Sequence, residues 1–245
     1  MLTKTLPVSA APQAALAAAV AGRTCTLWGA QATTLGLQVA TRVAQQGRTV
    51  RWICGDNRFD PYRVAEEAEA HEMYAEVALG QMQIARAFTA YQLTELVLRL
   101  RPENETGLVI VSGLCTSFLD EDVPNTDAAR LYYRTLWRTV RLTAQGLALL
   151  VIQQPPRLKT RRSYFLDDLQ RVSHRVLDVS GKETVTLTTK LRAGLQYLTT
   201  NEQERNQYGE NRGDVYANAR QLPATLEQGA PRFTAGRPIG MGSFV

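Results

Sequence analysis

Residues 24–54 read TCTLWGAQATTLGLQVATRVAQQGRTVRWIC and contain two short apolar runs on either side of a helical pattern. The first run, Thr24–Trp28, stops at Gly29, and the second run is Thr49–Cys54. Between them, apolar residues recur at helical spacing over Thr33–Gln46. The stretch therefore predicts a buried strand, a helix and a second buried strand, which is the repeating unit of a parallel sheet.

The same alternation continues on both sides of this unit. Short apolar runs alternate with amphipathic patterns, which is typical of an α/β fold whose mostly parallel central sheet is flanked by helices on both faces. After Leu166 the pattern becomes strand–turn–strand around Gly181, which predicts a C-terminal β-hairpin. We predict helices over residues 12–21, 62–73, 91–100 and 127–144, and strands over residues 82–88, 108–111, 147–152, 175–179 and 184–191.

The composition is that of an ordinary globular protein, with 44% apolar and 21% charged residues in a chain of 245. The three cysteines, Cys25, Cys54 and Cys115, form no CxxC pair, so we expect small buried residues in a reducing cytosol and neither a metal site nor redox chemistry. No stretch resembles a signal peptide or approaches the roughly 20 apolar residues of a membrane span. We therefore expect a soluble, cytoplasmic protein with no membrane partner.

From about Thr199 onward the sequence is rich in Gln, Asn, Gly, Arg and Pro and poor in aliphatic residues. Such a composition does not bury enough apolar surface to become ordered by itself. We therefore predict a core domain over residues 1–198 and a flexible tail over residues 199–245, which could fold against a partner.

A strand that ends in glycine and is followed by a helix is where a phosphate-binding P-loop would lie. A P-loop cradles phosphates with backbone N–H groups, while its lysine reaches the terminal phosphates and its Ser/Thr holds Mg²⁺. Counted from Gly29, the loop reads GAQATTLG, and its Gly, Lys and Ser/Thr positions hold Thr34, Leu35 and Gly36. A leucine cannot offset phosphate charge, so we predict no working P-loop. Thr33 or Thr34 could instead cap the following helix, with no ligand at all.

Several further motifs together resemble the RecA-type recombinases of archaea and eukaryotes. Residues 53–63 (ICGDNRFDPYR) resemble that family's I-D-T-E-G-T-F-R-P-E-R motif, and residues 85–89 (ARAFT) resemble its ARA[FY] strand. Residues 108–111 (LVIV) resemble its Walker B strand, and residues 152–155 (IQQP) resemble its strand ending in Asn-Gln, which senses nucleotide. The resemblance covers roughly residues 10–195 and implies a RecA-like core.

The departures from this family fall on the positions that handle nucleotide. Ser112 occupies the position of the Walker B aspartate, Asp56 that of the catalytic glutamate, and Gln154 is a counterpart of the sensing residue. Phosphoryl transfer depends on lysine and metal electrostatics, so we expect a pseudo-ATPase with no catalytic residue, metal or cofactor. Asp56, in a loop near Arg58, is alternatively a turn-stabilising carboxylate. The predicted degenerate nucleotide site comprises Gly29, Thr33, Thr34, Leu35, Gly36, Asp56, Ser112 and Gln154.

The family holds DNA with two loops, one after the Walker B strand and one after the Asn-Gln strand. Here the first loop, residues 117–127 (SFLDEDVPNTD), carries acidic side chains that would repel phosphates. The second loop contains RLKTRR at residues 157–162, followed by Tyr164 and Phe165. Basic residues neutralise phosphates and aromatic rings stack on bases, which indicates DNA binding by Arg157, Lys159, Arg161 and Arg162. A solvated surface is the alternative, and it applies equally to the row formed by Arg130, Arg134, Arg138 and Arg141.

The tail contains one candidate anchor for a protein partner. Members of the family assemble side by side, with a phenylalanine of one subunit docking on the next. Phe233, in the segment RFTAG, is an isolated large apolar residue in a polar context, and aromatic anchors dominate many interfaces. Its spacing departs from the family's Phe-x-x-Ala motif because Ala235 comes two residues later and not three. A tail without a partner is the alternative.

These observations predict a non-catalytic, recombinase-paralogue-like accessory protein of DNA recombination and repair. The net charge of +5 permits an anionic partner without requiring one. We expect the chain to bind DNA, including single strands, and a recombinase or another repair protein, to be able to form oligomers, and to be associated with the nucleoid if its source is prokaryotic. Two alternatives stay open: an atypical ATPase whose site is completed by a neighbouring subunit, and a regulatory partner protein that does not touch DNA.

Overall fold

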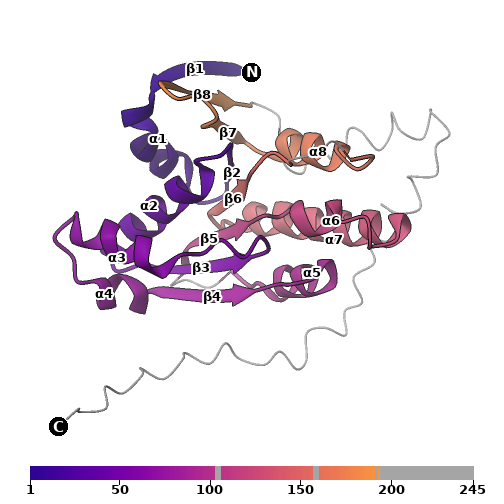
Figure 1. Cartoon of the computed structure of the whole chain (residues 1–245), viewed down its shortest axis with the longest axis horizontal. Helices are drawn as coiled ribbons and strands as arrows, with labels where there is room; N and C mark the ends of the chain where they lie inside the picture. The colour runs from indigo at the N-terminus through magenta and orange to yellow at the C-terminus, as the bar shows by residue number, and fades with distance from the viewer. Residues whose placement is uncertain (103–105, 157–159, 191–192, 194–245) are drawn as a thin grey trace, which may run out of the picture.

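A computed structural model describes residues 1–102, 106–156, 160–190 and 193 of the chain (Figure 1). The elements follow in the order β1 (Leu2–Pro7), a short 3₁₀ helix (Val8–Ala10), α1 (Ala11–Ala18), β2 (Thr24–Trp28), α2 (Ala32–Gln45), β3 (Thr49–Cys54), α3 (Pro61–Glu69), α4 (Ala75–Gly80), β4 (Met82–Arg86), α5 (Ala90–Arg99), β5 (Thr106–Ser112), α6 (Thr116–Leu119), α7 (Asn125–Ala144), β6 (Leu149–Gln153), α8 (Tyr164–Val172), β7 (Arg175–Asp178) and β8 (Thr184–Thr189).

All these strands belong to one mixed sheet with the order β1-β8-β7-β2-β6-β5-β3-β4 (Figure 1). The strands from β7 to β4 are parallel to one another, with Thr26 opposite Val151 and Ile53 opposite Val111. Strand β8 runs antiparallel to β7, and β1 runs antiparallel to β8. The predicted α/β class, the mostly parallel sheet and the C-terminal hairpin are therefore confirmed.

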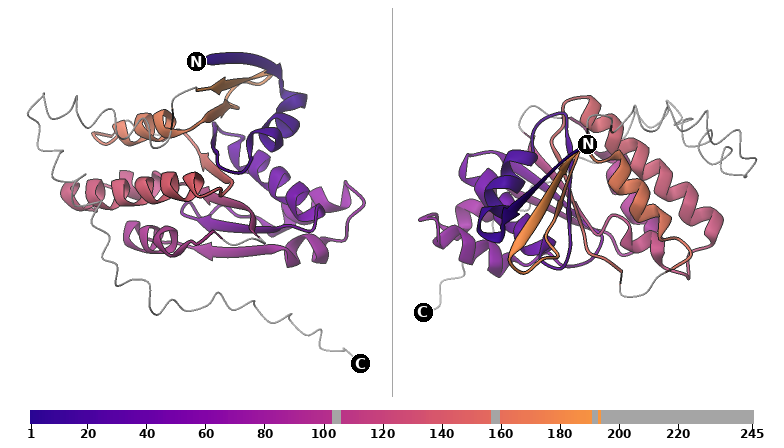
Figure 2. Two further views of the ribbon diagram at one scale, coloured as in Figure 1. Left: turned by 180° about the vertical axis from the view of Figure 1, so that it is seen from behind. Right: turned by 90° about the horizontal axis from the view of Figure 1, so that it is seen from above.

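Helices cover both faces of the sheet, as the view from above shows: the indigo and purple helices lie on one side and the pink and orange ones on the other (Figure 2). Helices α1 to α4 pack around Trp52 on the first face, while α5 to α8 pack around Phe118, Tyr132 and Phe165 on the second. The rings of Tyr132 and Phe165 stack with their centroids 4.2 Å apart. Each face thus has its own apolar core.

The structure departs from the predicted elements where local geometry interrupts a pattern. The predicted helix over residues 62–73 is wrong in its second half, because α3 ends at Glu69. Glu72 has a φ of 58° and the Met73 N–H bonds to the Ala68 carbonyl, which closes the helix. Strand β1 was not predicted, since its side chains are mostly exposed and carry no apolar alternation.

No helix in the described ranges combines the length and the apolar character needed to cross a bilayer. The predicted boundary at residue 198 and the predicted tail over residues 199–245 lie outside the residues that the structure describes.

Candidate functional site

The predicted nucleotide-site residues lie at the edge of the sheet where the parallel strands end, which we call the carboxyl edge. Gly29 follows β2, Asp56 follows β3, Ser112 ends β5 and Gln154 follows β6. Helix α2, after β2, covers one face of the sheet, whereas α8, after the neighbouring β6, covers the other. The helices after β3 and β5 diverge in the same way. In open α/β sheets this divergence opens the crevice in which ligands bind.

The connection from β2 to α2 is short and tightly packed. Residues 29–31 separate the strand from the helix, which begins at Ala32. Leu35 lies inside the helix, is 5% exposed and belongs to the apolar core beneath it. Gly36 approaches β6 so closely that a β-carbon there would lie 2.2 Å from Cδ1 of Ile152. Leu35 and Gly36, which the sequence analysis aligns with the lysine and Ser/Thr of a P-loop, are therefore part of the packing between α2 and the sheet.

The side chain of Gln154 lies against the connection between β2 and α2. Its Nε2 donates to the Ala30 carbonyl at 3.2 Å and to Thr33 Oγ1 at 3.3 Å, and its Oε1 accepts a hydrogen bond from Nη1 of Arg58. Gln154 thus joins the loop after β2 to the loop after β3. The alternative in which Thr33 or Thr34 caps α2 is wrong, because the N-cap residue is Gln31 and no side chain caps the helix.

Asp56 and Ser112 bond to each other across the ends of β3 and β5. The Ser112 hydroxyl, which is fully buried, donates to Asp56 Oδ1 at 2.8 Å and accepts from Nε1 of Trp52 at 3.0 Å. The Arg58 backbone N–H donates to the same Oδ1 at 3.3 Å. Gly113 has a φ of 66°, and a β-carbon there would lie 2.5 Å from the Asp56 Cβ. This geometry agrees with the turn-stabilising interpretation of Asp56.

Arg162 fastens the basic loop after β6 to the acidic loop after β5. Its Nε donates to Asn125 Oδ1 at 2.9 Å, its Nη1 to the carbonyls of Phe118 and Asp120, and its Nη2 to the carbonyl of Val123. The side chain is only 7% exposed. Arg162 was predicted to contact DNA, but its guanidinium is buried and occupied by these acceptors, so the structure gives it a loop-fastening role.

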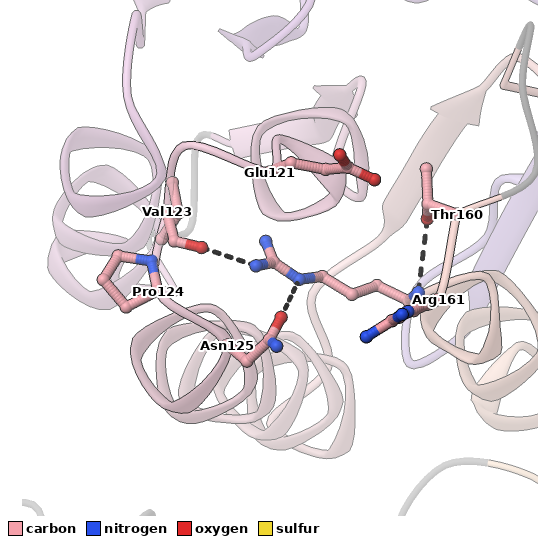
Figure 3. A pocket seen from close by; sticks show the side chains of 7 residues that line it. Glu121, Val123, Pro124, Asn125, Thr160 and Arg161 are labelled. Atoms are coloured by element: carbon pink, nitrogen blue, oxygen red, sulfur yellow. Dashed lines mark hydrogen bonds between the residues drawn. The ribbon is translucent and has the colours of Figure 1, made fainter.

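A cavity of about 340 Å³ lies between the same two loops (Figure 3). Glu121, Val123, Pro124 and Asn125 line it from the acidic loop, and Thr160, Arg161 and Arg162 line it from the basic loop. Arg161 is exposed, so it is the described member of the predicted DNA cluster that is available to an external anion. The other predicted DNA-binding and partner-binding residues, Arg157, Lys159 and the tail residue Phe233, lie outside the described residues.

Sequence reasoning missed the polar residues that hold the turn after β3. Nη1 of Arg86 donates to Oδ1 of Asn57, whose φ of 55° is uncommon for a residue with a side chain. Asp60 caps α3 by accepting from the backbone N–H groups of Tyr62 and Arg63. Asp followed by Pro is a helix-start pattern that could have been recognised from the sequence. Asn57 and Arg86, by contrast, are far apart in sequence, and no local pattern indicated that they bond to each other.

The described residues contain neither a group of side chains suited to a metal ion nor a cysteine with an activated thiol. No group of three or more His, Cys, Asp or Glu side chains in the described ranges is arranged to hold a metal ion. Cys25, Cys54 and Cys115 are free and buried, as predicted. Burial raises the pKa of Cys25 to about 12 and also raises the pKa of Cys115. Thiols with raised pKa values are poor nucleophiles at neutral pH.

Comparison with models of known protein families finds no match to this chain, and comparison with curated proteins finds none either. The geometry of the carboxyl edge therefore carries the functional conclusion.

Proposed function

We propose that the protein is a non-catalytic accessory of DNA recombination or repair, built on a RecA-like core that does not hydrolyse ATP. One observation carries this proposal: Leu35 and Gly36, at the P-loop lysine and Ser/Thr positions, are packed between α2 and the sheet. A P-loop needs a cation and a hydroxyl that are free to reach phosphates and Mg²⁺. Neither group is present at these two positions, and a side chain at position 36 would require Ile152 to move.

The remaining polar groups of the carboxyl edge support the same proposal. Asp56 and Ser112 bond to each other, and Gln154 bonds to Ala30, Thr33 and Arg58. Groups that would orient a nucleotide or its metal ion are thus used within the protein. An ATPase completed by a neighbouring subunit would have to break the bonds of Gln154 before a phosphate could reach residues 29–31.

DNA binding by the basic loop is the second part of the proposal. Arg161 is exposed beside the cavity, and the adjacent Arg162 bonds to four acceptors of the neighbouring loop. A backbone held at Arg162 presents the neighbouring Arg161 at lower entropic cost than a free one would. The facing loop carries Asp120, Glu121 and Asp122, whose charges repel phosphates. They favour a single extended DNA strand that contacts the basic loop alone.

Titration with MgATP followed by calorimetry tests the first part. We expect no heat of binding through millimolar nucleotide and no phosphate release above that of buffer. Binding at micromolar concentration would overturn the non-catalytic assignment and favour the atypical ATPase.

Fluorescence anisotropy with a labelled single-stranded oligonucleotide tests the second part. We expect the triple variant R157A/K159A/R161A to bind about tenfold or more weakly, and the slope of log K against log salt to fall by about 0.7 for each phosphate that is no longer neutralised. The control variant K4A/R63A/K182A removes the same charge from exposed cations elsewhere and should bind like the wild type. If neither the wild type nor the variants bind at low salt, a regulatory partner protein that does not touch DNA is the better assignment.

A further inference from the structure

The connection from β4 to α5 holds a phenylalanine ring in solvent. Phe88 lies at the carboxyl edge, one residue before the N-cap residue Thr89 of α5, and its side chain is 72% exposed. The backbone on either side of the ring is fixed. The Ala87 N–H donates to the Cys54 carbonyl at 2.9 Å, and the Phe88 N–H donates to Oε1 of Gln92 at 2.8 Å. The ring is therefore presented by a backbone that is already in place.

This ring does not pack on the helix that it precedes. An apolar residue just before the N-cap often packs on the fourth residue of the helix. Here that fourth residue is Leu93, which is fully buried in the core of the second face. Phe88 belongs to neither of the two apolar cores of the described residues. Because removal of an apolar ring from water is favourable, Phe88 is available to bind an external partner.

Two exposed arginines lie between the basic loop and Phe88. Nη1 of Arg58, after β3, donates to Oε1 of Gln154, which directly follows β6. Nη1 of Arg86, the last residue of β4, donates to Oδ1 of Asn57. Both acceptors are uncharged amide oxygens, which orient a guanidinium without neutralising its charge. Two fixed positive charges thus join the ends of β6, β3 and β4.

The carboxylates closest to these arginines in the chain are engaged within the protein. Asp56 accepts hydrogen bonds from the Ser112 hydroxyl and from the Arg58 backbone N–H. Asp60 accepts two backbone N–H groups of the first turn of α3, where the helix dipole offsets a negative charge. Residues 87–89 after β4 are Ala-Phe-Thr and carry no acid. In the described ranges neither Arg58 nor Arg86 pairs with a carboxylate.

We propose that Phe88 stacks on a base of single-stranded DNA whose phosphates contact Arg58 and Arg86. This site rests on the proposed function and deepens it, because it extends the strand held by the basic loop across the carboxyl edge. The strand order β6-β5-β3-β4 gives three spacings, or about 14 Å at about 4.8 Å each. Cations that follow the backbone, together with an aromatic ring that meets the bases, are typical of single-strand binding.

The surroundings of Phe88 favour a single strand over a duplex or a protein. In a duplex the bases are stacked on one another, so an exposed ring has no free base to meet. The centre of a protein interface is depleted of charged residues, whereas Phe88 lies between the exposed Arg86 and Thr89. The nearest exposed aromatic residue in the chain, Tyr91, donates its hydroxyl to the carboxylate of Asp127. That carboxylate would repel phosphates, so Phe88 is the better stacking residue.

Fluorescence anisotropy with a labelled oligodeoxythymidylate tests the stacking. We expect Phe88→Ala to bind about tenfold more weakly than the wild type. Phe88→Trp should bind at least as tightly as the wild type, and Phe88→Leu should resemble Phe88→Ala, because leucine is apolar but has no ring face. Tyr74→Ala is the matched control: it removes an aromatic side chain that is 80% exposed, in the connection between α3 and α4, and should bind like the wild type.

Two further measurements separate the base from the phosphates. An oligomer of abasic sites has the same phosphates without bases, so the wild type and Phe88→Ala should bind it equally. Binding of oligodeoxythymidylate should quench the indole fluorescence of Phe88→Trp and leave that of Tyr74→Trp unchanged. R58Q/R86Q should lower the slope of log K against log salt by about 0.7 for each phosphate that is no longer neutralised, whereas Phe88→Ala should keep the slope. Thermal unfolding checks that each variant is folded.

The outcomes distinguish this site from the basic loop. If R157A/K159A/R161A weakens binding and Phe88→Ala does not, the stacking proposal is wrong and the proposed function stands. If only Phe88→Ala weakens binding, the stacking stands and the basic loop is not the DNA site. Equal losses for the abasic oligomer and for oligodeoxythymidylate would overturn the stacking. A Phe88→Ala variant that changes oligomeric state in analytical ultracentrifugation and keeps its DNA affinity would overturn it in favour of a protein interface.

Discussion

Gly36 of α2 and Ile152 of β6 lie so close together that a side chain at position 36 would force Ile152 to shift: a β-carbon would lie 2.2 Å from Cδ1 and 3.0 Å from Cγ1 of Ile152. Ile152 is fully buried in the core between α2 and the sheet. The residue of a P-loop that binds Mg²⁺ is a serine or threonine at this position. In the proposed function, the loss of nucleotide binding thus follows from how the helix packs on the sheet as well as from which residues are absent.

The first prediction concerns this close approach. We expect Gly36→Ala to destabilise the protein by about 1–3 kcal/mol, because overpacking outweighs the gain in helix propensity of roughly 1 kcal/mol. Ile152→Val removes Cδ1, the atom in conflict, so the double variant should be more stable than the sum of the two single changes predicts. Urea unfolding of all four proteins measures the coupling. Thr34→Ala, an exposed change in the same helix, should stay within about 0.5 kcal/mol of the wild type; a Gly36→Ala variant as stable as the wild type would contradict the packing argument.

The buried strands and the α/β class could be predicted because periodicity reports burial. Thr24–Trp28 and Thr49–Cys54 were predicted with their observed bounds, since strands covered on both faces are continuous apolar runs. Helix α8 and strand β1 were not predicted. Helix α8 follows a proline-rich and basic segment, and β1 is stabilised by pairing with β8, almost the whole described chain away. Pairing at that sequence separation leaves no local pattern.

The second prediction separates two adjacent arginines. We expect Arg162→Ala to cost about 2–4 kcal/mol, because it leaves several carbonyls without the charge-assisted bonds that the guanidinium supplies. Arg162→Lys should recover little of this loss, since an ammonium cannot reach all four acceptors. Arg161→Ala should stay within about 0.5 kcal/mol of the wild type and weaken single-stranded DNA binding. Thermal unfolding and anisotropy on the same samples test both statements, and equal stability of the two alanine variants would disprove the fastening role.

The third prediction concerns Ser112, at the position of the Walker B aspartate. Ser112→Ala removes the donor to Asp56 and the acceptor for the Trp52 indole, so we expect a loss of about 1–3 kcal/mol. Ser112→Asp should be less stable than Ser112→Ala near neutral pH, because it buries a second carboxylate beside Asp56. Unfolding in the presence and absence of MgATP measures both effects. A Ser112→Asp variant that gains stability from MgATP would mean that the nucleotide site is intact and lacks only this residue.

The candidate site could be predicted in part. Asp56, Ser112 and Gln154 each come at or just after the end of a strand, so their meeting at one edge follows from the parallel sheet that the apolar runs predicted. Their use within the protein could not be predicted, since the bond between Asp56 and Ser112 depends on the register of β3 against β5. Arg162 could not be distinguished from Arg161 either. A run of basic residues gives the charge of a loop, whereas burial depends on which side chain faces the neighbouring loop.

The last prediction is a pH dependence that arises at His174, where β7 begins beside β2. Nδ1 of His174 accepts a hydrogen bond from the Thr24 N–H at 3.1 Å, and only the unprotonated nitrogen can do so. Burial, followed by the charges of Arg23 and Arg175, lowers the pKa of His174 below its ordinary value of 6.5. His174 therefore binds a proton more readily in the unfolded chain than in the folded protein. The stabilisation of the folded state that is present above pH 6.5 is lost as the pH falls below this value. His174→Asn keeps an acceptor near the same position without a titrating group, so its free energy of unfolding should depend less on pH in this range. His71→Asn leaves His174 in place and should keep the wild-type loss. Chemical unfolding at a series of pH values compares the three proteins, and parallel curves for the wild type and His174→Asn would show that the proton is taken up elsewhere.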